Sequence, residues 1–265
     1  MRVAVVGHVE WVDFVPVRRL PVPGEVVHAD GAFTRAAGGG GVAAAVLAEL
    51  GAEVDFYCAL GRDAHGEAVV AELESRGVTP HVAWSSHPTR RAVTMLEDGG
   101  ERTIVTIGER LDPPGSSELE WERLRGVDGV YFTAGDAAAL VHAREARELV
   151  ATPRARHALE GEGPMVDALV FSAGDRDESK WAARVAARAR LLVVTDGPRG
   201  GSWFGESEGT WPAVPPPGRP RDAYGCGDSF AAAFTYALAR GETVAGAAAL
   251  GAKVGAEVLT RRGAP

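Results

Sequence analysis

A nine-residue segment near the carboxyl end of the chain joins a glycine-rich turn to an acidic residue and the start of a helix. It runs from Asp222 to Phe230 and places Gly-Cys-Gly directly before Asp228. Apolar residues then recur every four positions, which predicts a helix over residues 229–240. The first N–H groups of a helix lack partners within it, and the small residues leave room for an anion to reach them. The segment therefore predicts a phosphate-binding site.

Asp228 stands where the turn meets the helix, and two roles fit that place. An aspartate there can cap the helix, or it can act as a general base that accepts the proton of a hydroxyl beside the phosphate. Because a helix N-terminus favours negative charge, we expect a lowered pKa and an ionised carboxylate at neutral pH. Cys226 is an alternative nucleophile, since helix N-termini activate thiols, but the sequence offers it no assignable histidine partner.

Alternating strands and helices must position this segment. The apolar run 3–6, followed by Gly7, is typical of a strand buried on both faces of a parallel sheet. Further strands are predicted over 54–60, 129–133, 168–171 and 191–195, and further helices over 64–76 and 179–190. The glycine run 38–41 predicts a loop that leads into a helix ending at Gly51. This order indicates an α/β fold with an open sheet covered by helices.

One stretch departs from this alternation. Residues 92–96 and 103–107 are rich in β-forming residues and flank Asp98-Gly99-Gly100, which predicts a hairpin. With the proline-punctuated segment 14–33, the hairpin could form a small sheet that projects from the main body, and a simple hairpin at the sheet edge is the alternative. Residues 151–164, rich in Arg, Glu, Gly and Pro, predict a surface connection.

Composition limits the possible partners. The chain has 265 residues, of which 46% are hydrophobic, so it can bury a full core. Its net charge of −8 argues against binding nucleic acid or anionic membranes by bulk charge. No long apolar run or secretory signal occurs, so we expect a cytoplasmic protein without a membrane span. Two cysteines and scattered histidines predict neither a disulfide framework nor a metal site.

Residues 222–230 resemble the second signature of the ribokinase or phosphofructokinase-B (PfkB) family of carbohydrate kinases, Asp-Thr-x-Gly-Ala-Gly-Asp-x-Phe, with Ala and Cys in place of Thr and Ala. Further elements similar to that family follow the same order. They are the glycine run 38–41 with its helix, residues 61–66, the lid hairpin 89–104 and residues 195–200. Several matching elements in order make the assignment specific, although each glycine run alone is a weak signal.

The resemblance implies a ribokinase-like three-layer α/β/α fold, with residues 1–265 as a single kinase domain and a β lid built from about 10–36 and 88–108. It implies ATP-dependent phosphorylation of a hydroxymethyl group on a sugar or related small molecule, with Mg²⁺ and room for a monovalent cation. Because lid strands in this family often pair between two subunits, a homodimer through the lid is also expected.

The resemblance also implies residue roles. Asp228 is the implied base, and Gly225, Cys226 and Gly227 would offer backbone N–H groups to the transferring phosphoryl group. The implied nucleotide contacts are Thr195, Gly197, Gly200 and Asp222, and the implied sugar contacts are Glu10, Asp13, Gly38, Gly39 and Arg91.

Three departures from the family pattern leave the activity open. Ala43 stands where the family has a sugar-binding Asn, and Ala173 and Arg176 replace the Asn and Glu of a Pro-Asn-x-x-Glu element that helps to place magnesium and phosphate. The acidic residues that could substitute are Asp175, Asp177 and Glu178. A protein that binds a sugar or nucleotide without turnover is therefore one alternative.

Two further alternatives concern the ligand. An adenosine-type nucleoside kinase would need an apolar, aromatic-lined acceptor pocket rather than a polar one. Gly39-x-Gly41-x-x-Ala44 could also pass for a dinucleotide fingerprint with Asp63 at the ribose, but residues 34–37 before it make a poor buried strand. No P-loop motif occurs.

Overall fold

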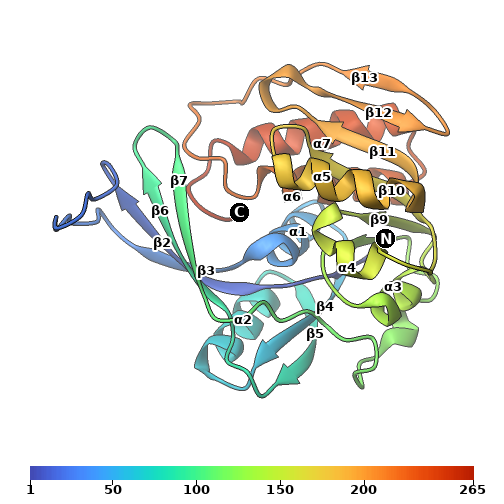
Figure 1. The fold of residues 1–265 in the computed structure, drawn as a ribbon, viewed down its shortest axis with the longest axis horizontal. Coiled ribbons are helices and arrows are strands. Elements are labelled where there is room, and N and C mark those ends of the chain that lie inside the picture. Colours follow the sequence, from blue (N-terminus) through green and yellow to red (C-terminus); the bar gives the residue numbers. More distant parts are fainter.

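A computed structural model describes residues 1–265 of the protein. A nine-stranded sheet forms the centre of the molecule (Figure 1). The strand order is β13-β12-β11-β10-β9-β8-β1-β4-β5. The strands from β11 to β5 run parallel, and β12 and β13 are added antiparallel at one edge. Their bounds are β1 Arg2–Val6, β4 Glu53–Gly61, β5 Val78–Ser85, β8 Gly129–Phe132, β9 Glu148–Ala151, β10 Val166–Ser172, β11 Ala189–Thr195, β12 Gly201–Gly205 and β13 Gly209–Trp211.

Helices cover both faces of this sheet, which confirms the three-layer α/β/α architecture. The helices are α1 Gly38–Glu49, α2 Ala64–Ser75, α3 Ala137–Ala143, α4 Arg156–Leu159, α5 Arg176–Val185, α6 Cys226–Ala239 and α7 Val244–Val258. Alternate residues of β1 show the two layers. Val3 and Val5 pack with α1, α6 and α7, whereas Ala4 and Val6 pack with α3, α4 and α5. None of the helices combines the length and the apolar character that a membrane span requires.

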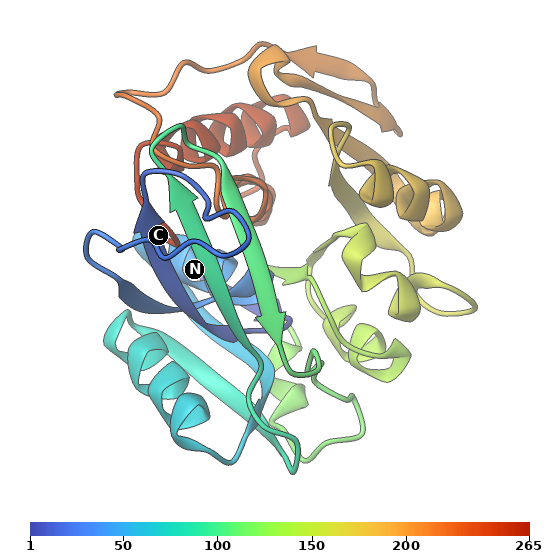
Figure 2. The ribbon, with the colours of Figure 1, turned by 60° about the vertical axis from the view of Figure 1, so that its left-hand side comes forward.

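A separate four-stranded sheet projects from this body and lies in front of it in Figure 2. It contains the segments predicted to form a lid, so we call it the lid sheet, and its closing over a ligand stays a prediction. Its order is β3-β2-β6-β7, with bounds β3 Phe33–Ala37, β2 Glu10–Val17, β6 Arg91–Glu97 and β7 Arg102–Ile107. The hairpin β6–β7 therefore belongs to a projecting sheet and not to the edge of the main one. The base of the lid packs through Val12 and Phe14 against Tyr224 and Ala264. β7 is the outer strand, and its Ile104, Val105 and Ile107 are exposed.

Some predicted boundaries are wrong, and local chemistry explains why. The helix predicted over 179–190 lies at Arg176–Val185, because Asp175 caps it by accepting the N–H groups of the next turn. The chain then makes a 3₁₀ turn and enters β11 at Ala189. The glycine run 38–41 is itself the first turn of α1 rather than a loop before it. Residues 151–164 include the end of β9 and α4, with Ala158 and Leu159 buried in the core.

Helix α7 fixes the position of α6, the helix that begins in the glycine-rich turn. The two helices approach closely at Gly251, where an added Cβ would lie 2.9 Å from the Phe230 ring and 3.0 Å from the Phe230 carbonyl oxygen. The backbone contact leaves no side-chain movement that would relieve the clash. One turn further on, at Gly255, an added Cβ would find its nearest atom, the Cys226 carbonyl oxygen, at 3.4 Å.

We predict opposite effects of alanine at these two positions. Gly251→Ala should lower the free energy of unfolding by about 1–3 kcal/mol, because the methyl group must push the helices apart. Gly255→Ala should leave it unchanged or raise it by up to about 1 kcal/mol, because alanine favours the helix. Urea denaturation followed by circular dichroism measures both. Equal effects of the two substitutions would contradict the close crossing at Gly251.

Candidate active site

The amino ends of α1 and α6 meet at one point, and glycines allow the approach. An added Cβ at Gly39, in the first turn of α1, would lie 2.9 Å from Oδ1 of Asp228, in the first turn of α6. Gly225 precedes α6 with φ +72°, a conformation that favours glycine, and an added Cβ there would lie 3.0 Å from Val42 of α1. Larger residues at either glycine would separate the two helix ends.

The N–H groups at the start of α6 are free to bind a ligand. Those of Gly225, Gly227 and Asp228 make no hydrogen bond within the protein, and that of Cys226 makes only a 3.4 Å contact with the Ala223 carbonyl oxygen. Gly227 is exposed, so no side chain covers this turn. Free N–H groups at the positive end of a helix are what an anion requires.

Asp228 does not cap the helix. The cap position belongs to Gly225, and no side chain caps α6. The Asp228 carboxylate instead accepts a hydrogen bond of 3.3 Å from the Tyr131 hydroxyl group, which comes from β8. Asp228 is half-buried, and enough of its surface is exposed for a ligand to reach it.

Surrounding groups set the protonation of this carboxylate. Burial raises the pKa of Asp228, the Arg154 charge lowers it and the Glu178 charge raises it, while Tyr131 and Arg110 lower it further. The net direction is upward, so the expectation of a lowered pKa is wrong. That expectation considered only the helix end, and it left out burial and a second carboxylate that the fold brings close.

A cluster of polar side chains lies next to this point, on the side of the lid. An added Cβ at Gly38 would lie 3.1 Å from Nε2 of His8 and 3.3 Å from Cγ of Glu10, so both side chains border the first turn of α1. Glu10 is 7% exposed, and its Oε2 lies 3.0 Å from Nε of Arg90. Burial raises the pKa of Glu10, while the charges of Arg90 and Arg110 oppose that rise.

Asp13 and Arg91 lie on the other face of the lid strands. Successive side chains of a strand alternate between its faces, so Glu10 and Asp13 point in opposite directions from β2. Asp13 forms its own ion pair with Arg91, with Oδ2 and Nη2 3.1 Å apart. Glu10 therefore borders Gly38 and His8, whereas the pair of Asp13 and Arg91 does not, and sugar contacts by that pair stay a prediction.

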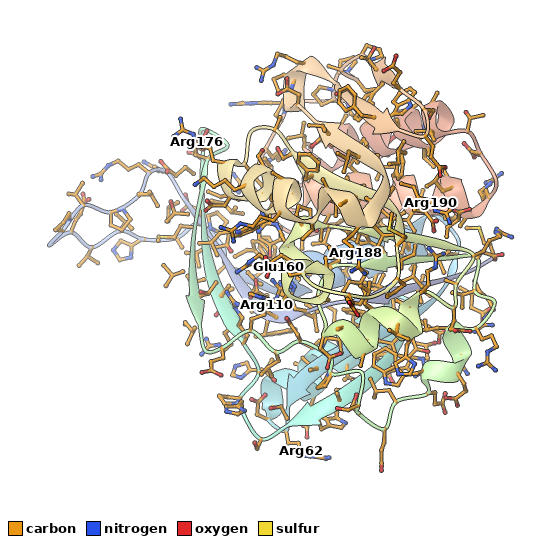
Figure 3. The ribbon with its side chains drawn as sticks, turned by 45° about the vertical axis from the view of Figure 1, so that its right-hand side comes forward. Arg62, Arg110, Glu160, Arg176, Arg188 and Arg190 are labelled. Atoms are coloured by element: carbon orange, nitrogen blue, oxygen red, sulfur yellow. The ribbon has the colours of Figure 1, made fainter.

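Two arginines that the sequence did not single out, Arg110 and Arg154, enter the site from loops. Arg110 lies at the foot of the lid (Figure 3), where it donates a 3.0 Å hydrogen bond to the Thr133 carbonyl oxygen. Arg154 follows β9 and pairs with Glu178 at 2.5 Å and with Asp175 at 3.1 Å. Both residues follow the ends of strands, and that position is the one sequence signal that could have found them.

Glu178 is the acidic residue of this segment that lies closest to the site by its contacts and its charge. It is 8% exposed, accepts an N–H hydrogen bond of 2.9 Å from Ser172, and its charge acts on Asp228. Of the other two acidic residues considered, Asp175 caps α5, and the exposed Asp177 pairs with Lys180. Glu178 is therefore the one of the three that takes part in the site.

The predicted nucleotide contacts lie at the carboxyl end of β11. Thr195 ends this strand beside Ser172 of β10, and its hydroxyl group donates to the Phe171 carbonyl oxygen at 3.3 Å. Gly197 and Gly200 follow with φ of +51° and +88°, and an added Cβ at Gly200 would lie 2.1 Å from the Trp211 carbonyl oxygen. Both glycines are thus fixed by backbone geometry, and their contact with nucleotide stays a prediction.

Asp222 stabilises the turn before α6 through two hydrogen bonds. It is 3% exposed, and its two carboxylate oxygens accept N–H hydrogen bonds of 2.8 Å from Tyr224 and Gly263. It therefore ties the turn before α6 to the end of the chain. Its role as a nucleotide contact also stays a prediction.

The structure removes two of the alternatives. Burial, together with the Asp222 charge, raises the pKa of the Cys226 thiol to about 12, so this residue is no activated nucleophile. The strand before the first glycine run, β3, belongs to the lid sheet and pairs antiparallel with β2, so no dinucleotide-binding β-α-β unit exists there. Asp63 caps α2 by accepting the Gly66 N–H group.

Comparison with known proteins agrees with this geometry. The model of the pfkB family of carbohydrate kinases matches residues 1–158 and 166–265. The chain belongs to this family.

Two curated relatives match parts of the chain. A ribokinase of Arabidopsis thaliana is 34% identical over 108 residues, which are 39% of this chain and 28% of that protein. An ATP-dependent ribose-1-phosphate kinase of Halopiger xanaduensis is 32% identical over 158 residues, 56% of this chain and 51% of that protein. The chain thus spans about half or less of the length of these relatives.

The fold itself is shared over the whole length. The solved structure of Arabidopsis thaliana ribokinase complexed with ribose and ATP superposes with a TM-score of 0.76 at 22% identity and covers 99% of this chain and 94% of that chain.

Proposed function

We propose that this member of the pfkB family catalyses ATP-dependent phosphorylation of a hydroxyl group on a sugar. The observation that carries the proposal is the half-buried Asp228 carboxylate beside the free N–H groups of Gly225 and Gly227. The family match and the names of the two kinase relatives support the same reaction.

The reaction follows from these two groups. The γ-phosphate of ATP lies at the free N–H groups that begin α6, with the acceptor hydroxyl group between it and Asp228. Asp228 takes the hydroxyl proton, the acceptor oxygen bonds to the γ-phosphorus, and the bond from that phosphorus to the β,γ-bridging oxygen breaks to leave ADP. The N–H groups stabilise the charge on the moving phosphoryl group. The predicted nucleotide contacts beside β11 hold the rest of ATP.

The polar side chains around the first turn of α1 favour a sugar over a nucleoside as the acceptor. Four buried polar atoms make no hydrogen bond. They belong to His8 and Glu10, which border Gly38, to Arg90, whose Nε lies 3.0 Å from Glu10 Oε2, and to Thr133, whose hydroxyl group borders Gly7. Leaving His8 Nδ1 and Thr133 Oγ1 unpaired costs about 1–3 kcal/mol each, and a hydroxyl-rich ligand removes this cost by pairing with them. An apolar, aromatic-lined pocket, as a nucleoside would need, does not fit this set.

ATP oxygens and water, rather than a set of protein side chains, would be the ligands of Mg²⁺ at this site. No group of three or more His, Cys, Asp or Glu side chains could hold an ion, and Glu178 already engages Arg154 and Ser172. Mg²⁺ keeps several waters and needs few protein ligands, so ATP oxygens and water suffice. When bound, it supplies charge neutralisation on the phosphates. A monovalent cation stays a prediction.

We also propose that two copies of the chain pair through their lids. β7 is an outer strand with free backbone groups, and Ile104, Val105 and Ile107 on it are exposed. An exposed apolar edge strand favours pairing with another strand. The use of ATP fits the cytoplasmic location expected from the sequence.

Replacing the base tests the reaction. Asp228→Asn keeps the shape of the side chain but cannot accept a proton, so kcat should fall by roughly 10²- to 10⁴-fold while ATP affinity stays nearly unchanged. A coupled assay for ADP and calorimetric titration with ATP measure the two quantities. Asp177→Asn, on the exposed side of α5, is the matched control and should leave both unchanged. Normal turnover of Asp228→Asn would refute the mechanism.

The acid side of the pH profile tests the electrostatics. Because the pKa of Asp228 is raised, activity should fall on acidification at a higher pH than an ordinary aspartate would give. Glu178→Gln removes a charge that raises this pKa, so the acid limb of log kcat/KM should move to lower pH. Arg154→Gln removes a charge that lowers it, so the limb should move to higher pH. A shift of both variants in one direction would contradict the assignment.

A further inference from the structure

Residues 61–66, which the proposed mechanism does not use, join the end of β4 to the start of α2. The Asp63 carboxylate in this segment bonds in two directions. Oδ1 accepts the N–H group of Gly66, in the first turn of α2, at 2.8 Å, and Oδ2 accepts the N–H group of Thr89 at 2.7 Å. Capping the helix needs only the first of these bonds. The second ties the start of α2 to a residue 26 positions further along the chain.

The charge of Asp63 makes both bonds strong. Burial raises the pKa of Asp63, but the hydrogen bonds from Gly66 and Thr89 lower it, and the net direction is downward. The carboxylate is therefore ionised at neutral pH and accepts with both oxygens. Hydrogen bonds to an ionised acceptor are stronger than those between neutral groups. Asp63 can thus hold Thr89 firmly while it caps α2.

Thr89 is packed against the end of β4. It is 3% exposed, and its hydroxyl oxygen accepts the N–H group of Gly61, the last residue of β4, at 3.0 Å. An added Cβ at Gly61 would lie 2.4 Å from the Thr89 nitrogen, and one at Gly66 would lie 2.3 Å from the Gly61 carbonyl oxygen. Because these near atoms belong to the backbone, only glycine at both positions permits the approach. Thr89 is therefore fixed to the main sheet.

The next residue belongs to the lid sheet. The Arg90 carbonyl oxygen accepts the N–H group of Trp11, in β2, at 3.1 Å, and β6 begins at Arg91. Thr89 and Arg90 thus mark the junction between the main sheet and the lid sheet. Consecutive Cα atoms are only about 3.8 Å apart, so a shift of Thr89 passes directly to Arg90.

The side chain of Arg90 depends on its backbone for its orientation. Its Nε lies 3.0 Å from Oε2 of Glu10, yet neither of these two atoms makes a hydrogen bond. The pair therefore lacks the two parallel hydrogen bonds that fix an arginine on a carboxylate. The place where the chain enters β6 then sets how Arg90 faces Glu10, which borders Gly38 and His8.

We propose that Asp63 is a positioning residue for the acceptor, because its bond to the Thr89 N–H group fixes Arg90 against Glu10 at the border of the acceptor site. The inference rests on the proposed function, in which these polar side chains surround the sugar. Asp63 itself touches no substrate. A displacement of about 1 Å in a site, caused by a residue outside it, can cost about 10²-fold in activity.

Hydrogen exchange of the free protein tests the tie without any substrate. Asp63→Ser keeps a good helix cap but supplies one short acceptor, so it should keep the bond to Gly66 and lose that to Thr89. The amides of residues 86–92 should then exchange at least about tenfold faster, as the loss of one charge-assisted bond predicts, while those of α2 stay unchanged. Equal acceleration of both segments would reduce Asp63 to a helix cap, and unchanged exchange of residues 86–92 would also overturn the inference.

Steady-state kinetics tests the effect on the acceptor. The substrates are ATP and whichever of D-ribose, D-glucose and D-fructose the wild type uses best. Asp63→Ser should raise KM for the sugar by about 10- to 100-fold, while kcat and KM for ATP stay within about twofold, because Arg90 and Glu10 border the sugar and not the nucleotide. A purely structural role would instead change kcat and both KM values together. An unchanged KM for the sugar would overturn the inference.

Threonine variants supply the rescue and the matched control. Thr89→Val removes the hydroxyl group that binds Gly61 and should also raise KM for the sugar, whereas Thr89→Ser keeps this group and should restore the wild-type value. Thr243→Val removes a hydroxyl group that caps α7, beyond the end of α6 that lies away from Asp228, and should leave KM unchanged. Equal responses to Thr89→Val and Thr243→Val would indicate a general loss of stability and contradict the inference.

A double substitution tests whether Asp63 acts through Arg90. In an Arg90→Gln background, Asp63→Ser should raise KM for the sugar further by less than about twofold, because the group that it positions is gone. Effects that multiply independently would overturn the inference. Should the wild type transfer phosphate to none of the three sugars, the proposed function would fail, whereas the exchange experiment would still decide whether Asp63 holds Thr89. The two failures are therefore distinguishable.

Discussion

Two helix ends that point at one place are the constraint on which the rest of the structure depends. The positive ends of α1 and α6 would repel each other if nothing negative stood between them. Asp228 supplies a carboxylate at this point, in reach of Gly39. The free N–H groups of Gly225 and Gly227 leave room for a second anion. The lid, α7 and the tie from Asp222 to Gly263 all hold these two ends in place.

Charge balance around this point then decides what can bind. Arg90 and Arg154 are matched by buried carboxylates, so they hold their neighbours in position without leaving a net charge. Glu178 raises the pKa of Asp228 and Arg154 lowers it, and the two side chains touch each other. The pKa of Asp228 therefore depends on the opposing charges of Glu178 and Arg154 and not on one neighbour alone. Arg110 is the exception to this balance, because its ion-pair partner, Asp112, has a side chain that is 40% exposed.

The sequence could predict the parts that depend on local patterns. Apolar runs located the parallel strands, and the turn before Asp228 indicated the anion site because small residues and a helix start stand next to each other. Arg110 and Arg154 could not be found in this way, because they lie in connecting segments and their charges act on Asp228 only through the fold. The predicted direction of the Asp228 pKa shift was wrong for the same reason, because Glu178, which raises this pKa, is 50 residues away in sequence. Alternation along β2 separates Glu10 from Asp13, a distinction that spacing alone did not make.

The most direct measurement of the central claim is a crystal structure of the protein with ADP, magnesium, fluoroaluminate and a bound sugar. Planar fluoroaluminate occupies the position of the moving phosphoryl group. The account predicts that its fluorines lie within hydrogen-bond distance of the N–H groups of Gly225 and Gly227, and that the sugar hydroxyl group lies between aluminium and the Asp228 carboxylate. Fluoroaluminate bound away from the start of α6, or Asp228 turned away from the sugar, would contradict it.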